Sequence, residues 1–163
     1  MDVAVAAAMA SKFRNAGQTC VCANRFLVHA SVHDEFVSKL AAQVKGLTVG
    51  HGLVDGVAIG SLINDAGVKK VKSQVEDAVG KGAKIVCGGE GGEEGVESAS
   101  NTGGSFYPPT VLTGCTSSMQ CFREETFGPL VPIMSFESEE EAIAIANEAD
   151  VGLAGYFCSK DLG

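Results

Sequence analysis

The chain has 163 residues, 45% of them hydrophobic and 20% charged, which is enough apolar material for the core of one domain. Its formal net charge of −8 and the absence of a Lys/Arg cluster argue against binding to nucleic acid or to an anionic membrane surface. The six cysteines are too scattered for a secreted disulfide scaffold. We therefore expect a reducing compartment, either the cytoplasm or the mitochondrial matrix.

Neither a metal site nor a membrane segment is expected. There is no C-x-x-C pair, and the histidines do not combine i, i+4 spacing on a helix with an acidic ligand. The apolar stretch over residues 3–10 is too short to cross a membrane, and no basic residue precedes it as in a signal peptide. We interpret this stretch as a core helix and expect no targeting signal in the chain.

The elements expected after this helix alternate between short apolar strands and amphipathic helices. In chain order they are a strand over 25–29, a helix over 31–47, a helix over 65–80, strands over 84–87, 106–112 and 130–136, a helix over 139–150, and a strand over 154–158. Ser31, Asn64 and Ser138 are placed to cap the last three helices. Such alternation predicts an α/β fold with a mostly parallel sheet flanked by helices.

A glycine-rich stretch over residues 88–105 is predicted to be a flexible surface loop. It holds seven glycines and four acidic residues but no aromatic residue. The acidic side chains would repel phosphate, and no lysine or helix-opening Ser/Thr follows, so we exclude a phosphate-binding loop.

Residues 12–22, K-F-R-N-A-G-Q-T-C-V-C, carry the strongest functional signal in the chain. A thiolate attacks a carbonyl well when it is accessible and its charge is supported. Gly17, close to an amide and a hydroxyl side chain, suits a turn whose backbone N–H groups reach an oxyanion. Cys20 is therefore a candidate nucleophile. On local chemistry alone, the commoner fate of a free cysteine is that of a small buried hydrophobic residue.

This run resembles the nucleophile motif F-x-N-x-G-Q-x-C of the aldehyde dehydrogenase superfamily, with Cys20 in the nucleophile's place. A second motif that resembles the same family follows at residues 124–129, E-E-T-F-G-P. The resemblance extends over residues 7–161 and is closest to succinate-semialdehyde dehydrogenases, with glutarate-semialdehyde dehydrogenases almost as close. It implies that residues 1–163 are a partial catalytic domain of this fold, incomplete at both ends. The cofactor-binding and oligomerisation segments would be absent.

The resemblance also implies roles for individual residues. Cys20 would attack the aldehyde to give a thiohemiacetal and then a thioester, which water cleaves. Glu125 and Phe127 stand where the family contacts the nicotinamide ribose of NAD or NADP. Arg14 would meet the distal carboxylate of the semialdehyde, for which a planar guanidinium is well suited. The general base and the oxyanion-binding Asn would lie outside the chain.

Alternative interpretations remain for these residues. Arg14 can instead be a surface arginine paired with an acid, and Glu125 a solvated glutamate in a turn. Cys22 lies two residues after Cys20, so in an extended segment both thiols face the same way, which permits a reversible disulfide. Equally, Cys22 can be a packed thiol behind the nucleophile.

The resemblance predicts NAD(P)-dependent oxidation of succinate semialdehyde to succinate, in 4-aminobutyrate breakdown, by a parent enzyme that is a dimer or tetramer. Two rival functions stand beside this one. The chain could be a catalytically inactive folding or assembly unit, because half of the machinery would be missing. It could also be a thiol hydrolase, which would need one of the three histidines, His29, His33 or His51, held against Cys20.

Overall fold

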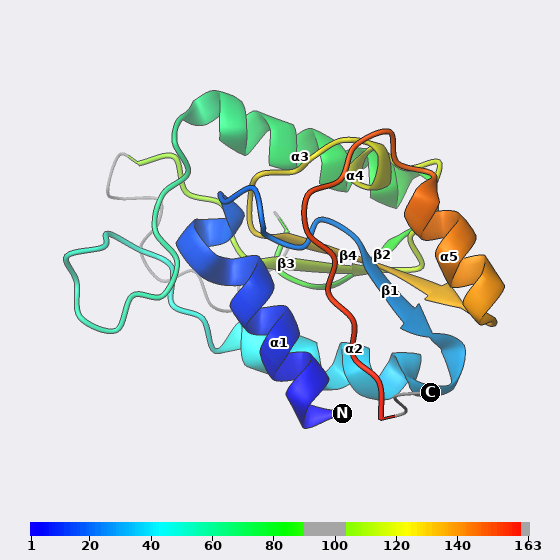
Figure 1. The fold of residues 1–163 in the computed structure, drawn as a ribbon. Helices are drawn as coiled ribbons and strands as arrows, with labels where there is room; N and C mark the ends of the chain where they lie inside the picture. Colours follow the sequence, from blue (N-terminus) through cyan, green and yellow to red (C-terminus); the bar gives the residue numbers. More distant parts are fainter. Residues whose placement is uncertain (90–103, 161–163) are drawn as a thin grey trace.

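The computed structural model describes residues 1–89 and 104–160. Its helices are α1 (Asp2–Phe13), the 3-10 helix η1 (Arg14–Gly17), α2 (Ala30–Lys45), α3 (Asp65–Gly80), α4 (Gln120–Arg123) and α5 (Glu139–Asn147). Its strands are β1 (Phe26–His29), β2 (Lys84–Cys87), β3 (Thr110–Thr113) and β4 (Leu130–Phe136). Helices and strands alternate along most of the chain, as the sequence predicts, and form an α/β structure (Figure 1).

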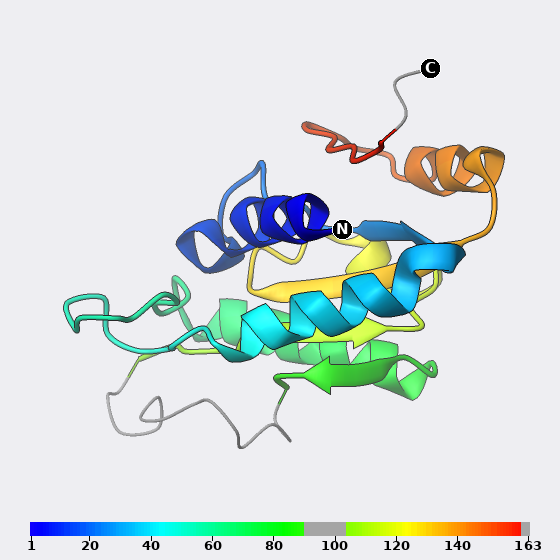
Figure 2. The same cartoon turned by 90° about the horizontal axis from the view of Figure 1, so that it is seen from below.

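The four strands form one sheet in the order β1-β4-β3-β2. β4 lies between β1 and β3 and is parallel to both, whereas β2 joins the far edge in the antiparallel sense. Figure 2 shows the strands one above another in this order, with β2 at the bottom. The prediction of a mostly parallel sheet is confirmed.

Helices cover both faces of this sheet, with α1 and α2 on one side and α3 and α4 on the other (Figure 1). Leu40 on α2 and Val71 on α3 are fully buried from the two sides. Between them, the side chains of β4 form the centre of the core, because its first five residues are all buried. A strand enclosed on both faces has a nearly continuous apolar sequence, and L-V-P-I-M at the start of β4 is such a run.

Helix caps agree with the sequence at two of three positions. The Asn64 side chain accepts from the backbone N–H of Gly67 (3.0 Å), and the Ser138 hydroxyl accepts from that of Glu141 (3.2 Å). The prediction for Ser31 is wrong, because α2 begins at Ala30 and the His29 ring accepts from the Ser31 N–H (3.1 Å). The His29 imidazole nitrogen is therefore the group that accepts from a free backbone N–H at the start of α2, a role that the sequence assigned to the Ser31 hydroxyl.

Two strand predictions need correction. β3 begins at Thr110 rather than at residue 106, since Pro108 and Pro109 have no N–H to donate to a ladder. Residues 154–158 are exposed and form no strand, because no strand in the described part of the chain pairs with them. The predicted loop over 88–105 lies mostly outside the described residues.

Candidate active site

The residues from Arg14 to Cys22, here called the nucleophile turn, connect α1 to the segment before β1. Three successive residues in this turn have positive φ, namely Asn15 (49°), Ala16 (55°) and Gly17 (77°). This left-handed run turns the chain sharply at the end of α1, and it places alanine in a conformation that normally favours glycine or asparagine. The strain is located within five residues of Cys20, which lies exposed in the turn that follows.

The side chain of Gln18 fixes this turn to a distant loop. Its amide nitrogen donates to the Asn15 carbonyl (3.1 Å), and its amide oxygen accepts from the backbone N–H of Ile63 (2.8 Å). The same nitrogen lies 3.4 Å from the Ser61 carbonyl. The loop before α3 therefore contributes directly to the position of the thiol.

The two sequence motifs meet at Gly17 and Gly128. A Cβ atom added to Gly17 would collide with the carbonyl group of Gly128 and lie 3.1 Å from the Pro129 nitrogen. Gly128 is also close to α3, since a Cβ atom added to Gly128 would lie 2.5 Å from a methyl carbon of Val71. The E-E-T-F-G-P segment (residues 124–129) is thus held between the nucleophile turn and α3.

From residue 125 to residue 127 the side chains alternate between the surface and the interior. Thr126 is fully buried and donates its hydroxyl hydrogen to the Gln74 side chain on α3 (2.8 Å), whereas Glu125 and Phe127 are both exposed. Phe127 has φ of 51° and is 37% exposed. An exposed carboxylate can accept hydrogen bonds from the hydroxyls of a bound molecule, and an exposed ring two residues later can pack against such a molecule.

Arg14 is exposed at the start of the nucleophile turn. In the described residues its guanidinium forms no ion pair, so the surface pairing considered from the sequence is not seen. Its backbone carbonyl lies 3.7 Å from the Cys22 sulfur. The side chain therefore extends from the same turn as Cys20 with its charge available to an anion.

Cys22 is half-buried and packs within the turn. Its sulfur lies 2.8 Å from the Thr19 hydroxyl, and its N–H donates to the Thr19 carbonyl (2.9 Å). The segment is therefore a hydrogen-bonded turn rather than the extended chain from which the orientation of the two thiols was predicted. That premise is wrong, although the spacing of two residues still keeps both thiols in one turn.

Lys12 is a charged residue that the sequence analysis did not select. Only 1% of it is exposed, and it lies on the last turn of α1 beneath the nucleophile turn. Burial lowers the pKa of Lys12 to about 8, while the electrostatic effects of Cys22 and Glu125 raise the pKa in the opposite direction. The core helix predicted from the sequence ends at residue 10, so its apolar pattern gave no signal for a buried side chain at Lys12.

The histidines form contacts away from Cys20. His29 bonds to the Ser31 hydroxyl (2.8 Å), and His33 lies between Asp34 (2.8 Å) and Thr113 (2.9 Å). His51 accepts from the Leu53 N–H (3.4 Å). A histidine beside Cys20, which the thiol hydrolase hypothesis requires, is not seen in the described part of the chain.

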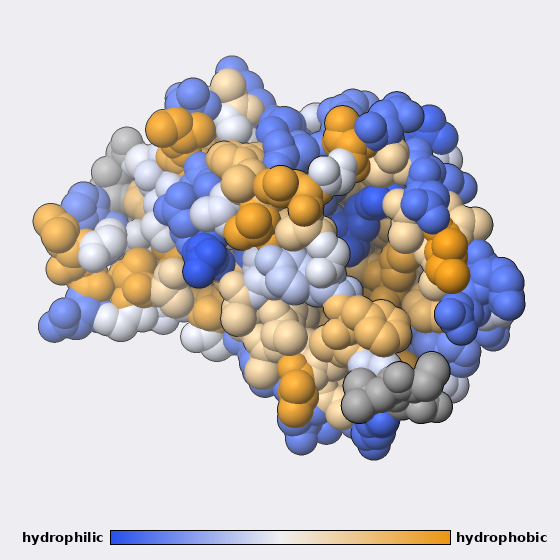
Figure 3. Space-filling view, in the orientation of Figure 1, coloured by the Kyte–Doolittle hydropathy of each residue, from blue (hydrophilic) through white to orange (hydrophobic). Residues whose placement is uncertain are grey.

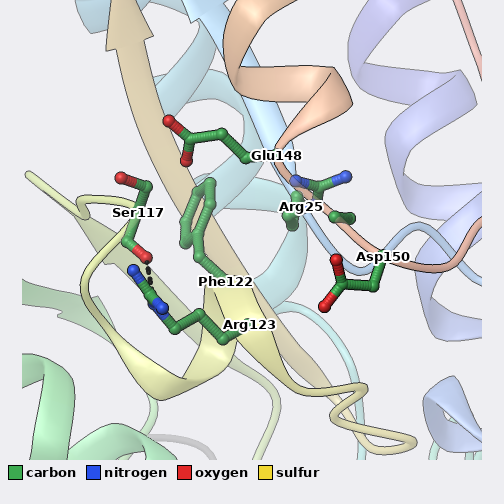
Figure 4. A pocket seen from close by; sticks show the side chains of 7 residues that line it. Arg25, Ser117, Phe122, Arg123, Glu148 and Asp150 are labelled. Carbon is green, nitrogen blue, oxygen red and sulfur yellow. Dashed lines mark hydrogen bonds between the residues drawn. The ribbon is translucent and has the colours of Figure 1, made fainter.

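A cavity of about 260 Å³ lies beside α5 rather than at the nucleophile turn. Figure 3 shows this face of the molecule hollowed there. Both terminal nitrogens of Arg25 donate to carbonyls at the end of α5, Ile145 (3.1 Å) and Ala146 (3.1 Å). Across the cavity the Arg123 guanidinium donates to the Ser117 carbonyl (2.9 Å; Figure 4). Both arginines thus donate their hydrogen bonds to backbone carbonyls.

The described residues hold neither a cluster suited to a metal ion nor a helix suited to a membrane. Residues 1–89 and 104–160 contain no group of three or more His, Cys, Asp or Glu side chains arranged to hold a metal ion. In the same ranges, no helix combines the length and apolar character needed to span a bilayer.

The chain matches the model of the aldehyde dehydrogenase family over residues 1–163. It is 56% identical to the mitochondrial succinate-semialdehyde dehydrogenase of Mus musculus, over 99% of this chain and 29% of the relative. It is 48% identical to the NADP(+) succinate-semialdehyde dehydrogenase of Escherichia coli K12, over 99% of this chain and 32% of the relative.

Among solved structures, the succinate-semialdehyde dehydrogenase of Burkholderia pseudomallei superposes with a TM-score of 0.91 at 50% identity. The superposition covers 99% of this chain and 32% of that structure. The chain thus spans about a third of the length of the proteins that it matches. The family match over all residues and the meeting of its two motifs at Gly17 and Gly128 lead to one conclusion. This chain belongs to the aldehyde dehydrogenase family.

Proposed function

We propose that the chain is the nucleophile-bearing part of a dehydrogenase that oxidises succinate semialdehyde to succinate with NAD or NADP. The observation that carries this proposal is the convergence of two motifs that are about a hundred residues apart. The nucleophile turn, with its exposed Cys20, contacts the E-E-T-F-G-P segment, which presents Glu125 and Phe127 to solvent. One surface region thereby offers a thiol for the aldehyde and a carboxylate for a sugar.

Within the chain, Cys20 is the residue that would form the covalent intermediates. The Cys20 thiolate adds to the aldehyde carbon, a C–S bond forms, and the carbonyl π electrons move to oxygen. The backbone N–H of Cys20 donates to this oxyanion. Collapse of the oxyanion would leave a thioester on Cys20 as the carbon gives up a hydride. A nicotinamide whose ribose is held by Glu125 and Phe127 would supply the acceptor for that hydride.

Hydrolysis then completes the cycle. Water adds to the thioester, the C–S bond breaks, and the acid leaves with regeneration of the Cys20 thiol. A general base must remove a proton from that water. We propose that this base, the remaining oxyanion donor and the dinucleotide-binding fold are supplied by segments of the parent enzyme outside these residues.

For the substrate, we propose that the Arg14 guanidinium binds the carboxylate at the far end of the semialdehyde. An exposed cation six residues before the nucleophile defines a separation between the anion and the reacting carbon. Glutarate semialdehyde, one methylene longer, is the alternative substrate. The names of the mouse and Escherichia coli relatives favour the succinate compound. We further propose 4-aminobutyrate breakdown as the setting of this oxidation.

For the cofactor and cellular setting, the proposals are NAD or NADP, a homodimer or homotetramer, and the cytoplasm or the mitochondrial matrix. The Escherichia coli relative is named for NADP(+) and the mouse relative for mitochondria. With either cofactor, the proposed role of Glu125 is to accept hydrogen bonds from the ribose hydroxyls, and that of Phe127 is to pack beside the ribose.

A chimera tests the proposed function. This chain replaces the matching 32% of the Escherichia coli relative, and the chimera is assayed with succinate semialdehyde and either cofactor. We expect saturable NADH or NADPH formation from the chimera, none from its Cys20→Ser variant, and none from the 163-residue chain alone. An inactive but folded chimera contradicts the proposal, as does turnover by Cys20→Ser.

A further inference from the structure

Asn24, four residues after Cys20, uses its whole side-chain amide on one distant backbone segment. Its nitrogen donates to the carbonyls of Cys121 (3.1 Å) and Glu124 (3.1 Å). Its oxygen accepts from the backbone N–H of Thr126 (2.8 Å). Two donors facing two carbonyls and one acceptor facing one N–H match the hydrogen-bonding capacity of a primary amide in only one orientation.

These contacts hold the backbone on both sides of Glu125. The carbonyl before it and the N–H after it are both bonded to Asn24, so the peptide planes on either side of Glu125 are fixed from the nucleophile side. The Gln74–Thr126 bond fixes the same segment from α3. Asn24 differs from Gln74 because it is joined by only four residues to the thiol.

We propose that Asn24 is a positioning residue, which sets the place of the Glu125 carboxylate relative to the Cys20 thiol. This inference rests on the proposed function. Hydride transfer requires the aldehyde carbon and the acceptor to be aligned closely, and small displacements reduce the rate strongly. The Asn24 amide ties the backbone on both sides of Glu125 to the segment that follows the nucleophile turn, and so keeps that alignment when either segment moves.

The chemistry of the amide predicts which replacements fail. Asn24→Ala removes all three bonds and leaves two carbonyls and one N–H without their partner. Asn24→Asp keeps an acceptor for Thr126 but turns a carboxylate oxygen toward the carbonyls of Cys121 and Glu124. Neither variant alters the residues from Arg14 to Cys22. Asn147→Ala is the matched control, because among the described residues the Asn147 amide donates only to the Ile143 carbonyl in its own helix (2.9 Å).

The first measurement is independent of catalysis. Backbone hydrogen exchange of the peptide containing residues 124–128 is compared in the 163-residue chain, Asn24→Ala and Asn147→Ala. We expect about tenfold faster exchange at Thr126 in Asn24→Ala, as for the loss of one to two net hydrogen bonds, and no change in Asn147→Ala. Unchanged exchange at Thr126 in a folded Asn24→Ala overturns the proposal.

The second set of measurements uses the chimera described above. We expect Asn24→Ala to raise KM for the dinucleotide about tenfold and to reduce the thermal stabilisation that the dinucleotide provides. Alkylation of Cys20 by iodoacetamide without cofactor should proceed at the unchanged rate. Asn24→Ala with unaltered cofactor KM, or with Cys20 alkylation and cofactor KM impaired together, contradicts a role in placing Glu125.

The two sets also separate this inference from the proposed function. If the unsubstituted chimera fails to oxidise aldehydes, the proposed function is wrong and the role of Asn24 in placing Glu125 for catalysis falls with it. The exchange data then still decide whether Asn24 holds the backbone around Glu125. If the chimera is active and Thr126 exchange is unchanged in Asn24→Ala, only the inference is wrong.

Discussion

Gly17 and Gly128 are in direct backbone contact, and this contact joins the nucleophile turn to the E-E-T-F-G-P segment. Gly17 also has φ of 77°, a conformation that an L side chain adopts only with strain. Two requirements therefore coincide at Gly17: a left-handed backbone and the absence of Cβ. The site depends on both.

Gly17→Ala separates these requirements when it is compared with Gly56→Ala. Gly56 has φ of 83° but nothing within 4 Å of an added Cβ, so its substitution reports backbone strain alone. We expect Gly56→Ala to lower the free energy of unfolding by about 1 to 2 kcal/mol and Gly17→Ala by about 1 to 3 kcal/mol more. Urea unfolding of the chain measures both. Equal losses would show that the contact with Gly128 has no energetic weight.

Arg14→Leu tests substrate recognition in the chimera. We expect KM for succinate semialdehyde to rise and kcat/KM to fall. The fall should correspond to a loss of about 2 to 4 kcal/mol of transition-state stabilisation, as when one partner of a desolvated charge pair is truncated. Butyraldehyde has the same carbon skeleton without the carboxylate, so kcat/KM for butyraldehyde should hardly change. Steady-state kinetics with both aldehydes decides the matter. Equal losses would make Arg14 a structural arginine.

Cys22→Ala tests the possible disulfide with Cys20. In the unsubstituted chimera, mild oxidation should suppress activity and a dithiol should restore it, with a two-hydrogen mass loss in the peptide that holds both residues. Cys22→Ala should retain activity and lose the reversible response. The control is Cys115→Ala, which replaces a buried cysteine two residues after the end of β3. If Cys22→Ala responds to oxidant and dithiol like its parent, the switch does not exist.

Lys12→Met tests the cost of burying a charge under the nucleophile turn. The pKa of Lys12 is lowered from 10.5 to about 8 by burial, so between these values the unfolded chain binds more protons than the folded chain. Stability from this group therefore rises with pH across that window, and its charge is destabilising at lower pH.

We expect Lys12→Met to be more stable than the parent at pH 7. This advantage should shrink by about 2 kcal/mol between pH 8 and pH 9.5, as the buried amine loses its proton in the parent. Denaturant unfolding at several pH values measures the difference, with the exposed Lys69→Met as the control that should show no pH-dependent change. A constant difference between Lys12→Met and the parent from pH 7 to 10 would show that the buried amine does not titrate in this window.

Local signals in the sequence determined most helices, two of the three expected caps and the motif of the candidate nucleophile. The apolar spacing on α2 and α3 requires only neighbours three or four residues away, and the Asn64 and Ser138 caps act within one turn. The Cys20 motif is likewise a contiguous run. Such features are written in short stretches of sequence, so they could be predicted without a structure.

Only the tertiary structure decided what these pieces contact. Asn24 bonds to Thr126, which is 102 residues away, and Gln18 bonds to Ile63, which is 45 residues away; neither pairing leaves a periodic trace in the sequence. The burial of Lys12, the contact of Gly17 with Gly128 and the absence of a strand at residues 154–158 depend in the same way on which segments pack or pair together. Periodicity specifies the face that a segment buries, whereas chain folding selects the partner on that face, and the geometry around Cys20 is made by those partners.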